Sequence, residues 1–168
     1  MSSPNIYFSE CSNGVAMYRG IMTGFLGSDL RTKTATIYDT GDDRISYTNI
    51  GPLGLAILSV FAKQAETANK YLYISTATVS QNEILTALEK ATGEKWTINK
   101  VSTKEAGKIG AEKMAKGDFS GIVSLLHRHM YGGDTGRDFR EKLSNGLLGL
   151  PSESLGETER DTVAGKRP

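Results

Sequence analysis

Three glycines near the start of the chain, Gly20, Gly24 and Gly27, have the spacing of a loop that could hold the phosphates of a nucleotide. Such a loop needs a strand that leads into the glycines and a helix whose N-terminal amides then meet the pyrophosphate. Here residues 14–23 have a helical pattern, and residues 28–33 are polar and lead to a predicted strand. We therefore interpret the glycines as the end of a helix and a turn, and we assign no cofactor-binding residue.

The two histidines, His127 and His129, are the other candidates for acid–base chemistry. They lie two positions apart on a predicted helix and so face different directions, which favours one packing histidine and one surface histidine over a catalytic pair. The single cysteine, Cys11, cannot form an internal disulfide and has no adjacent base, and no Cys/His spacing is typical of zinc. We expect no catalytic residue and no metal site.

Established catalytic motifs are missing from the sequence. None of the seven tyrosines is followed four positions later by lysine, and neither a Gly-x-Ser-x-Gly elbow nor a Walker loop occurs. Met17, Tyr18 and Met22 could instead line an apolar pocket, although packing is the more common role of such a helix.

Composition and charge exclude several classes of partner. The chain has 168 residues, enough for one domain, and its 20 basic and 19 acidic residues are mixed, with no basic stripe for nucleic acid. Residues Met1–Glu10 lack the pattern of a signal peptide, and the longest apolar stretch, Leu53–Ala62, is too short to span a bilayer. We expect a cytoplasmic protein with no nucleic-acid or membrane partner.

The elements that must position any site begin with a predicted helix over residues 14–23. Two alternating runs, Thr34–Tyr38 and Arg44–Thr48, are separated by the turn-rich residues 39–43. This pattern predicts a β-hairpin with a five-residue loop.

A helix is expected over residues 50–63. Thr48 and Asn49 are good N-cap residues for it, and Pro52 falls in its first turn, where the missing N–H is harmless. The apolar residues that recur at helical spacing are Leu53, Ala56, Ile57, Val60 and Phe61. They predict one buried stripe.

The clearest local signal is a capping box of Ser80 and Glu83, followed by a helix over Gln81–Thr92 that Gly93 should end. The residues before it, Lys70–Thr76, are aromatic and β-branched and predict a strand.

The rest of the chain predicts one more strand and mostly helices. The expected segments are a strand over Trp96–Val101, helices over Thr103–Lys116 and Asp118–Tyr131, a loop over 132–138 and a helical stretch over Phe139–Leu150. So few strands cannot satisfy one another in a sheet with a helix on each face. The pattern is α/β and indicates that most of the sheet lies in a piece of chain not present here.

Several segments resemble one protein family in this order and spacing. They are Thr23–Gly27, Ala35–Asp39 with Gly41 and Asp42, Arg44–Ile50, Ala68–Ser75, Thr78–Leu85, Ala91–Trp96, Gly117–Phe119, Lys142–Asn145 and Leu147–Pro151. Together they resemble the NmrA-like family, the isoflavone-reductase-like branch of atypical short-chain dehydrogenases, over about residues 13–155. No single motif is diagnostic, but the collinear set is fairly specific.

The resemblance implies an incomplete Rossmann-type NAD(P)-binding fold. Residues 1–155 would be its C-terminal, substrate-side subdomain with few strands and several helices, and residues 156–168 a polar, frayed tail. The family's N-terminal half, which holds NADP or NAD and, in reductases, a catalytic lysine, is missing, so we expect this chain alone to bind no dinucleotide. The substrate-binding candidates are Met17, Tyr18, Ile21, Phe25 and Leu26.

The family suggests an NAD(P)H-dependent oxidoreductase that acts on a small aromatic or phenolic molecule. This chain would supply the pocket walls and be inactive by itself. A non-catalytic, dinucleotide-sensing regulator and a truncated gene product are the alternatives. The isolated chain should also expose the apolar sides of Leu53–Phe61 and Leu72–Ile74, which could drive self-association.

Overall fold

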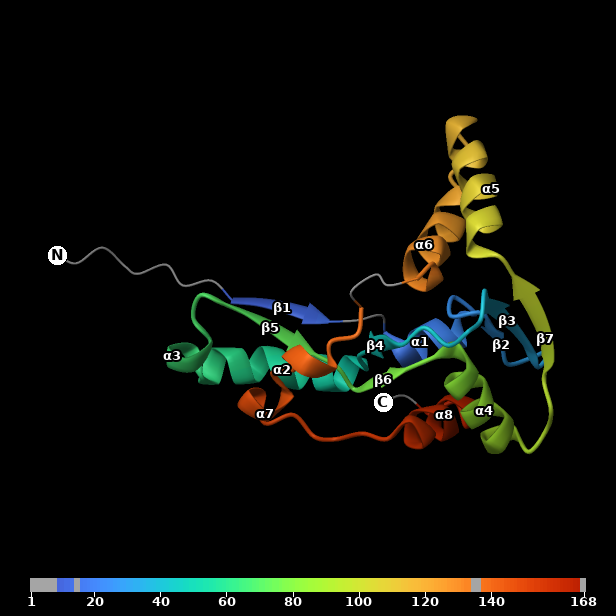
Figure 1. The fold of residues 1–168 in the computed structure, drawn as a ribbon. Helices are drawn as coiled ribbons and strands as arrows, with labels where there is room; N and C mark the ends of the chain where they lie inside the picture. Colours follow the sequence, from blue (N-terminus) through green and yellow to red (C-terminus); the bar gives the residue numbers. More distant parts are fainter. Residues whose placement is uncertain (1–8, 14–15, 134–136, 167–168) are drawn as a thin grey trace.

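The computed structural model of the chain (Figure 1) describes residues 9–13, 16–133 and 137–166, without the side chains of 9–13. The helices are α1 (Met17–Met22), α2 (Ile50–Ala62), α3 (Gln64–Thr67), α4 (Gln81–Thr92), α5 (Thr103–Ala115), α6 (Gly121–Tyr131), the 3-10 helix η1 (Arg140–Lys142), α7 (Asn145–Leu148) and α8 (Leu155–Val163). The strands are β1 (Ser9–Asn13), β2 (Ser28–Asp29), β3 (Thr34–Tyr38), β4 (Ile45–Tyr47), β5 (Lys70–Ile74), β6 (Ala77–Val79) and β7 (Thr97–Val101).

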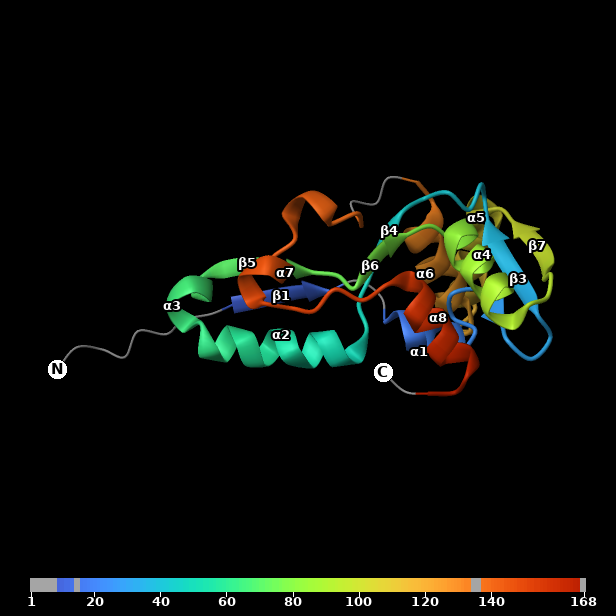
Figure 2. The same ribbon diagram turned by 90° about the horizontal axis from the view of Figure 1, so that it is seen from below.

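Among the described residues, the strands form three small sheets. β1 pairs with β5 in parallel, β3 pairs with β2 antiparallel and with β7 in parallel, and β4 pairs with β6 antiparallel. In Figures 1 and 2, β1, β5 and α2 extend as an arm to one side, and in Figure 1 α5 and α6 project from the part that holds β3 and β7. The mixed α/β class expected from the sequence is confirmed.

The predicted hairpin of Thr34–Tyr38 and Arg44–Thr48 is wrong. β3 pairs with β7 instead, and β4 pairs with β6. The cause lies at Asp39, which takes a left-handed φ of 51° and whose carboxylate accepts hydrogen bonds from the amide and hydroxyl of Thr103. The residue that follows β3 is therefore hydrogen-bonded to the start of α5, and the chain does not turn back to form a hairpin.

The local signals of α4 are confirmed, whereas the side-chain cap expected for α2 is not. Ser80 and Glu83 form the reciprocal capping box of α4, and Gly93 ends the helix with a left-handed φ of 71°. Asn49 is the N-cap residue of α2, but its side chain does not cap the helix. Its Oδ1 accepts a hydrogen bond from the Tyr18 amide, and its Nδ2 donates to the Thr158 hydroxyl at 3.0 Å. Asn49 thus joins three segments that are distant in sequence.

Later boundaries differ from the expected ones. The strand after α4 begins at Thr97, and the helix expected from Asp118 begins at Gly121. The expected helical stretch Phe139–Leu150 is two short helices, η1 and α7. α5 and α6 pack so closely that a Cβ on Gly121 would lie 2.3 Å from the carbonyl oxygen of Gly110.

The expected frayed tail of residues 156–168 is wrong for residues 156–163. They belong to α8, whose start has a capping box of Ser154 and Glu157, and which packs against α1 and α4. The side chains that α8 buries are polar, namely Thr158, Glu159 and Thr162. A hydrophobic pattern therefore could not reveal this helix as part of the core.

The buried apolar side chains form two clusters. The larger one lies among α1, β3, β4, α4 and α6 and contains Met17, Ile21, Leu26, Ala35, Ile37, Tyr38, Ile45, Tyr47, Val79, Ile84, Leu85, Leu88, Trp96, Met130 and Tyr131. The smaller one lies in the arm and contains Ala56, Leu72, Ile74 and Leu148. Leu72 and Ile74 are thus covered by α2 and α7, so the expectation that this strand exposes them is wrong.

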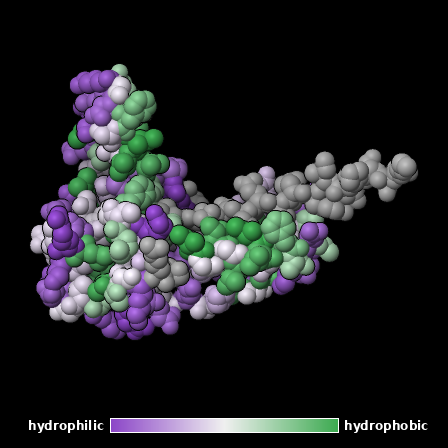
Figure 3. All heavy atoms as spheres, turned by 180° about the vertical axis from the view of Figure 1, so that it is seen from behind, coloured by the Kyte–Doolittle hydropathy of each residue, from purple (hydrophilic) through white to green (hydrophobic). Residues whose placement is uncertain are grey.

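The expected exposure of the apolar side of α2 is confirmed at Ile57 and Phe61, and the prediction of one buried stripe is wrong at these two positions. Leu58 is 66% exposed and Phe61 is 68% exposed. Ile50, Leu55 and Ile57 are exposed as well. Figure 3 shows hydrophobic side chains gathered along the arm and on the projecting α5–α6 pair. In the described part of the chain, no helix combines the length and hydropathy that crossing a bilayer requires.

We expect the chain to bind a hydrophobic dye such as anilinonaphthalene sulfonate because α2 leaves this face open. Replacing Leu58 and Phe61 together by glutamate should lower the dye fluorescence, and the signal that remains should come from the exposed apolar side chains of the α5–α6 pair. Glutamate at the exposed Gln64 and Ala65 of α3 adds charge without removing a large apolar side chain and should leave it unchanged. Equal fluorescence from both variants would contradict the assignment of the dye to α2.

Candidate functional site

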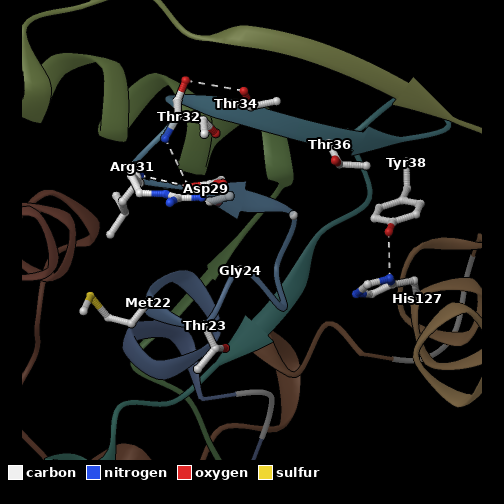
Figure 4. A pocket seen from close by; sticks show the side chains of 13 residues that line it. Met22, Thr23, Gly24, Asp29, Arg31, Thr32, Thr34, Thr36, Tyr38 and His127 are labelled. Carbon is white, nitrogen blue, oxygen red and sulfur yellow. Dashed lines mark hydrogen bonds between the residues drawn. The ribbon is translucent and has the colours of Figure 1, made fainter. Parts of the chain in front are cut away.

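A pocket of about 760 Å³ opens where the α1–β2 loop, β3 and α6 meet (Figure 4). It is lined by Met22, Thr23, Gly24, Gly27, Ser28, Asp29, Leu30, Arg31, Thr32, Thr34, Thr36, Tyr38 and His127. A cavity of this size is within the range of small-molecule sites.

β3 forms one wall because its residues alternate between two faces. Thr34, Thr36 and Tyr38 face the pocket, while Ala35 and Ile37 lie in the larger core cluster. A hydrogen bond of 2.7 Å from the Thr36 amide to the Gly27 carbonyl joins this wall to the loop.

Tyr38 and His127 form the most chemically defined pair of the pocket. The Tyr38 hydroxyl lies 2.6 Å from His127 Nδ1, and His127 Nε2 lies 2.7 Å from the Phe25 carbonyl oxygen. Because a carbonyl can only accept, Nε2 carries the imidazole hydrogen, and Nδ1 of the neutral ring accepts from the Tyr38 hydroxyl. The hydrogen-bond partners thus fix the tautomer.

Burial holds this pair in its neutral form. It lowers the pKa of His127, with the Phe25 carbonyl opposing it, and it raises the pKa of Tyr38. Both shifts follow from the cost of a charge away from water. At neutral pH the pair therefore presents a phenol and an uncharged imidazole.

The surroundings hold the two rings in place. The Tyr38 ring stacks on Tyr131 with centroids 5.1 Å apart and planes 7° apart, and Phe25 contacts the His127 ring at 5.1 Å. The Tyr38 amide also donates to Gln81 Oε1 at 2.9 Å. Such packing favours a preorganised site.

The charged residues of the lining lie on the side away from this pair (Figure 4). Asp29 Oδ1 accepts from the amides of Arg31 and Thr32 at 2.9 and 3.1 Å. Hydrogen bonds from Thr32, and more weakly from the Arg31 amide, lower the pKa of the exposed Asp29. The pocket thus has a polar rim and a neutral aromatic end.

The residues predicted to bind substrate lie mostly in the core and not in the lining of this pocket. Met17, Ile21 and Leu26 are core side chains, Tyr18 is half-buried on α1, and Phe25 contributes its carbonyl to His127. None of the five is a lining residue of the pocket, and their substrate role stays a prediction.

The glycines and histidines lie where the sequence interpretation expected them, and His127 is in addition a lining residue of the pocket. Gly24 and Gly27 form a turn after α1 with φ values of 75° and 89°. His127 is buried in the packing described above, whereas His129 is exposed.

The pairing of Tyr38 with His127 was not predicted. The polar residues at alternate positions of β3 are a signal that could have indicated a pocket wall. No signal in the sequence joins Tyr38 to a histidine 89 positions away.

Comparisons with known proteins indicate the kind of protein. No protein-family model matches the chain. The chain is 36% identical over 146 residues to "Oxidoreductase aprR" of Aspergillus flavus. This match covers 84% of this chain and 48% of that protein. It is 27% identical to "Oxidoreductase poxI" of Penicillium oxalicum, over 93% of this chain and 51% of the relative. The chain therefore spans about half the length of these curated relatives.

Solved structures show the fold. Leucoanthocyanidin reductase of Vitis vinifera, in a binary complex with NADPH, matches 95% of this chain and 55% of its own with a TM-score of 0.71 and 16% identity. Triphenylmethane reductase of Citrobacter, complexed with NADP(H), matches 92% of this chain and 53% of its own chain. The TM-score is 0.62 and the sequence identity is 18%. The chain is thus similar to fungal oxidoreductases and has the mixed α/β fold found in NAD(P)-dependent reductases.

Proposed function

We propose that this chain is the C-terminal, substrate-side part of an NAD(P)-dependent oxidoreductase of the isoflavone-reductase-like kind. The observation that carries the proposal is the two-stranded parallel sheet of β1 (Ser9–Asn13) and β5 (Lys70–Ile74). Parallel sheets occur almost only as larger assemblies covered by helices on both faces, and the most common sheets have about four to six strands. Together with a length about half that of the relatives, this pair supports a sheet whose remaining strands come from elsewhere.

The glycine loop after α1 does not fit a dinucleotide. Gly24 and Gly27 follow a helix and lead into the two-residue strand β2, so no helix N-terminus faces a pyrophosphate there. The backbone of Gly27 is also closed against β3, because a Cβ on it would lie 2.4 Å from the Thr36 carbonyl oxygen. We therefore place dinucleotide binding, and the hydride chemistry that NADP or NAD would supply, outside these residues.

The pocket supports the substrate side of the proposal. Its neutral end of Tyr38 and His127, next to Thr36, suits a small, uncharged aromatic or phenolic molecule. In the proposed protein this chain binds and orients that molecule, in the cytoplasm, and is inactive alone.

Calorimetry tests the proposal directly. NADPH titrated into the purified chain should give no tight one-to-one binding. A chimera in which this chain replaces its matching region of the Aspergillus flavus relative should bind NADPH one to one. Tight binding by the chain alone, or a folded chimera that fails to bind, would contradict the proposal.

A further inference from the structure

Both hydrogens of the Tyr38–His127 pair already take part in hydrogen bonds. His127 uses Nε2–H on the Phe25 carbonyl and uses Nδ1 to accept the hydrogen of the Tyr38 hydroxyl. A phenol has one hydrogen to donate but can also accept. The Tyr38 oxygen therefore keeps acceptor capacity and has no second hydrogen to offer.

A ligand that only accepts hydrogen bonds gains little from this arrangement. A carbonyl or ether oxygen could bond to Tyr38 only if the hydroxyl turned away from His127, and Nδ1 would then lose its buried partner. Leaving a buried acceptor without a partner costs more than one ordinary hydrogen bond contributes. A ligand hydroxyl needs no such rearrangement because it donates to the acceptor that is present.

The walls near the pair limit the rest of the ligand. The rings of Tyr38 and His127, with centroids 4.8 Å apart and planes 40° apart, supply an aromatic surface at this end of the pocket, while the apolar Met22 lies across the pocket on the side of Arg31. The charged lining residues Asp29 and Arg31 lie on the other side. The surface next to the Tyr38 oxygen is therefore uncharged and suits the ring of a neutral aromatic molecule.

We propose that the Tyr38–His127 pair makes this pocket selective for neutral, aromatic ligands that donate a hydroxyl hydrogen to the Tyr38 oxygen, against counterparts that can only accept. The selectivity rests on the proposed function, in that it treats this pocket as the substrate site. The pair is a specificity-determining group and takes no assigned part in hydride transfer.

A matched pair of probes tests the selectivity on the full chain. 2-Naphthol and 2-methoxynaphthalene share one ring system, but only the first can donate a hydroxyl hydrogen. We expect 2-naphthol to bind about five to ten times more tightly, as one net hydrogen bond would give. Equal affinities, or no binding of either probe at millimolar concentration, would overturn the proposal.

Two variants assign the preference to Tyr38. Tyr38→Phe keeps the ring that stacks on Tyr131 and removes the acceptor, so the affinity ratio should fall to about one. Tyr73→Phe makes the same change at a half-buried tyrosine of β5 outside the lining and should leave the ratio unchanged. A ratio that persists in a folded Tyr38→Phe protein would overturn the proposal.

A spectroscopic measurement keeps the test valid if Tyr38→Phe fails to fold. In ¹⁵N spectra of the imidazoles, with His129→Gln used to assign the signals, 2-naphthol should shift the Nδ1 resonance of His127 and 2-methoxynaphthalene should not. The same shift with both probes would overturn the proposal. These outcomes are independent of the NADPH titrations, so failure of the selectivity is distinguishable from failure of the proposed function.

Discussion

Replacing Glu159 by glutamine should stabilise the fold at pH 8 by several kcal/mol and leave it nearly unchanged at pH 4.5. Glu159 lies on α8 with none of its side chain exposed, and neither carboxylate oxygen has a hydrogen-bond partner in the described part of the chain. Burial raises the pKa of Glu159 from 4.5 to about 8. An uncharged glutamine has nearly the same shape and avoids the cost of a buried charge.

The sign of the pH dependence follows from proton binding. Between pH 4.5 and about 8, Glu159 is protonated in the folded chain and ionised in the unfolded chain. The unfolded state therefore binds fewer protons, and the free energy of unfolding falls by about 1.4 kcal/mol per pH unit from this group. Its stabilising contribution is complete below pH 4.5 and is lost as the pH rises to about 8.

Urea unfolding at pH 5, 6.5 and 8 measures the effect. The difference between Glu159→Gln and the parent chain should grow with pH, and taking the difference cancels shared contributions such as that of His127. Glu112→Gln, at an exposed position of α5, should show no such growth. A constant difference for Glu159→Gln across the three pH values would show that Glu159 is not held protonated.

Replacing Gly27 by alanine should destabilise the chain by about 3 kcal/mol or more. Gly27 has φ of 89°, which an L-residue adopts only with strain, and its added Cβ would lie 2.4 Å from the Thr36 carbonyl oxygen. The obstacle is backbone of β3, so relief requires β3 to separate from the loop. That movement would also disturb the pocket wall.

Thermal melting checks this prediction against a glycine with free space. Gly54 lies within α2, and a Cβ there would contact nothing within 4 Å. Gly54→Ala should therefore raise the melting temperature, since alanine favours a helix by about 1 kcal/mol over glycine. A similar change in melting temperature for both variants would show that the contact at Gly27 is unimportant.

Local signals allowed the sequence to predict individual helices. The signals that begin and end α4 depend only on residues of that helix, namely the capping box of Ser80 and Glu83 and the terminating Gly93. The helix accordingly has the expected bounds. The fold class could likewise be predicted, because the alternation of helical and strand patterns is a local property and the family resemblance agreed with it.

Strand partners and the pocket could not be predicted in the same way. β3 takes a distant partner because Asp39 bonds to Thr103, an interaction between segments 64 positions apart. α8 was missed because its buried face consists of Thr158, Glu159 and Thr162, whose types are typical of exposed tails. In each case the deciding contact is between segments and leaves no periodic pattern in the sequence.

The strand register has a consequence for how the chain reaches its native state. Apart from the short β2–β3 hairpin, the pairings join remote segments, with Ser9 opposite Lys70 and Thr34 opposite Thr97. On the ribosome, β3 emerges long before β7 exists. The edge of β3 that pairs with β7 therefore stays unpaired while α2, β5 and α4 are synthesised. Such non-local topology gives slow refolding and exposes unpaired edges to aggregation meanwhile. Chaperones that protect nascent chains should therefore raise the yield of this protein.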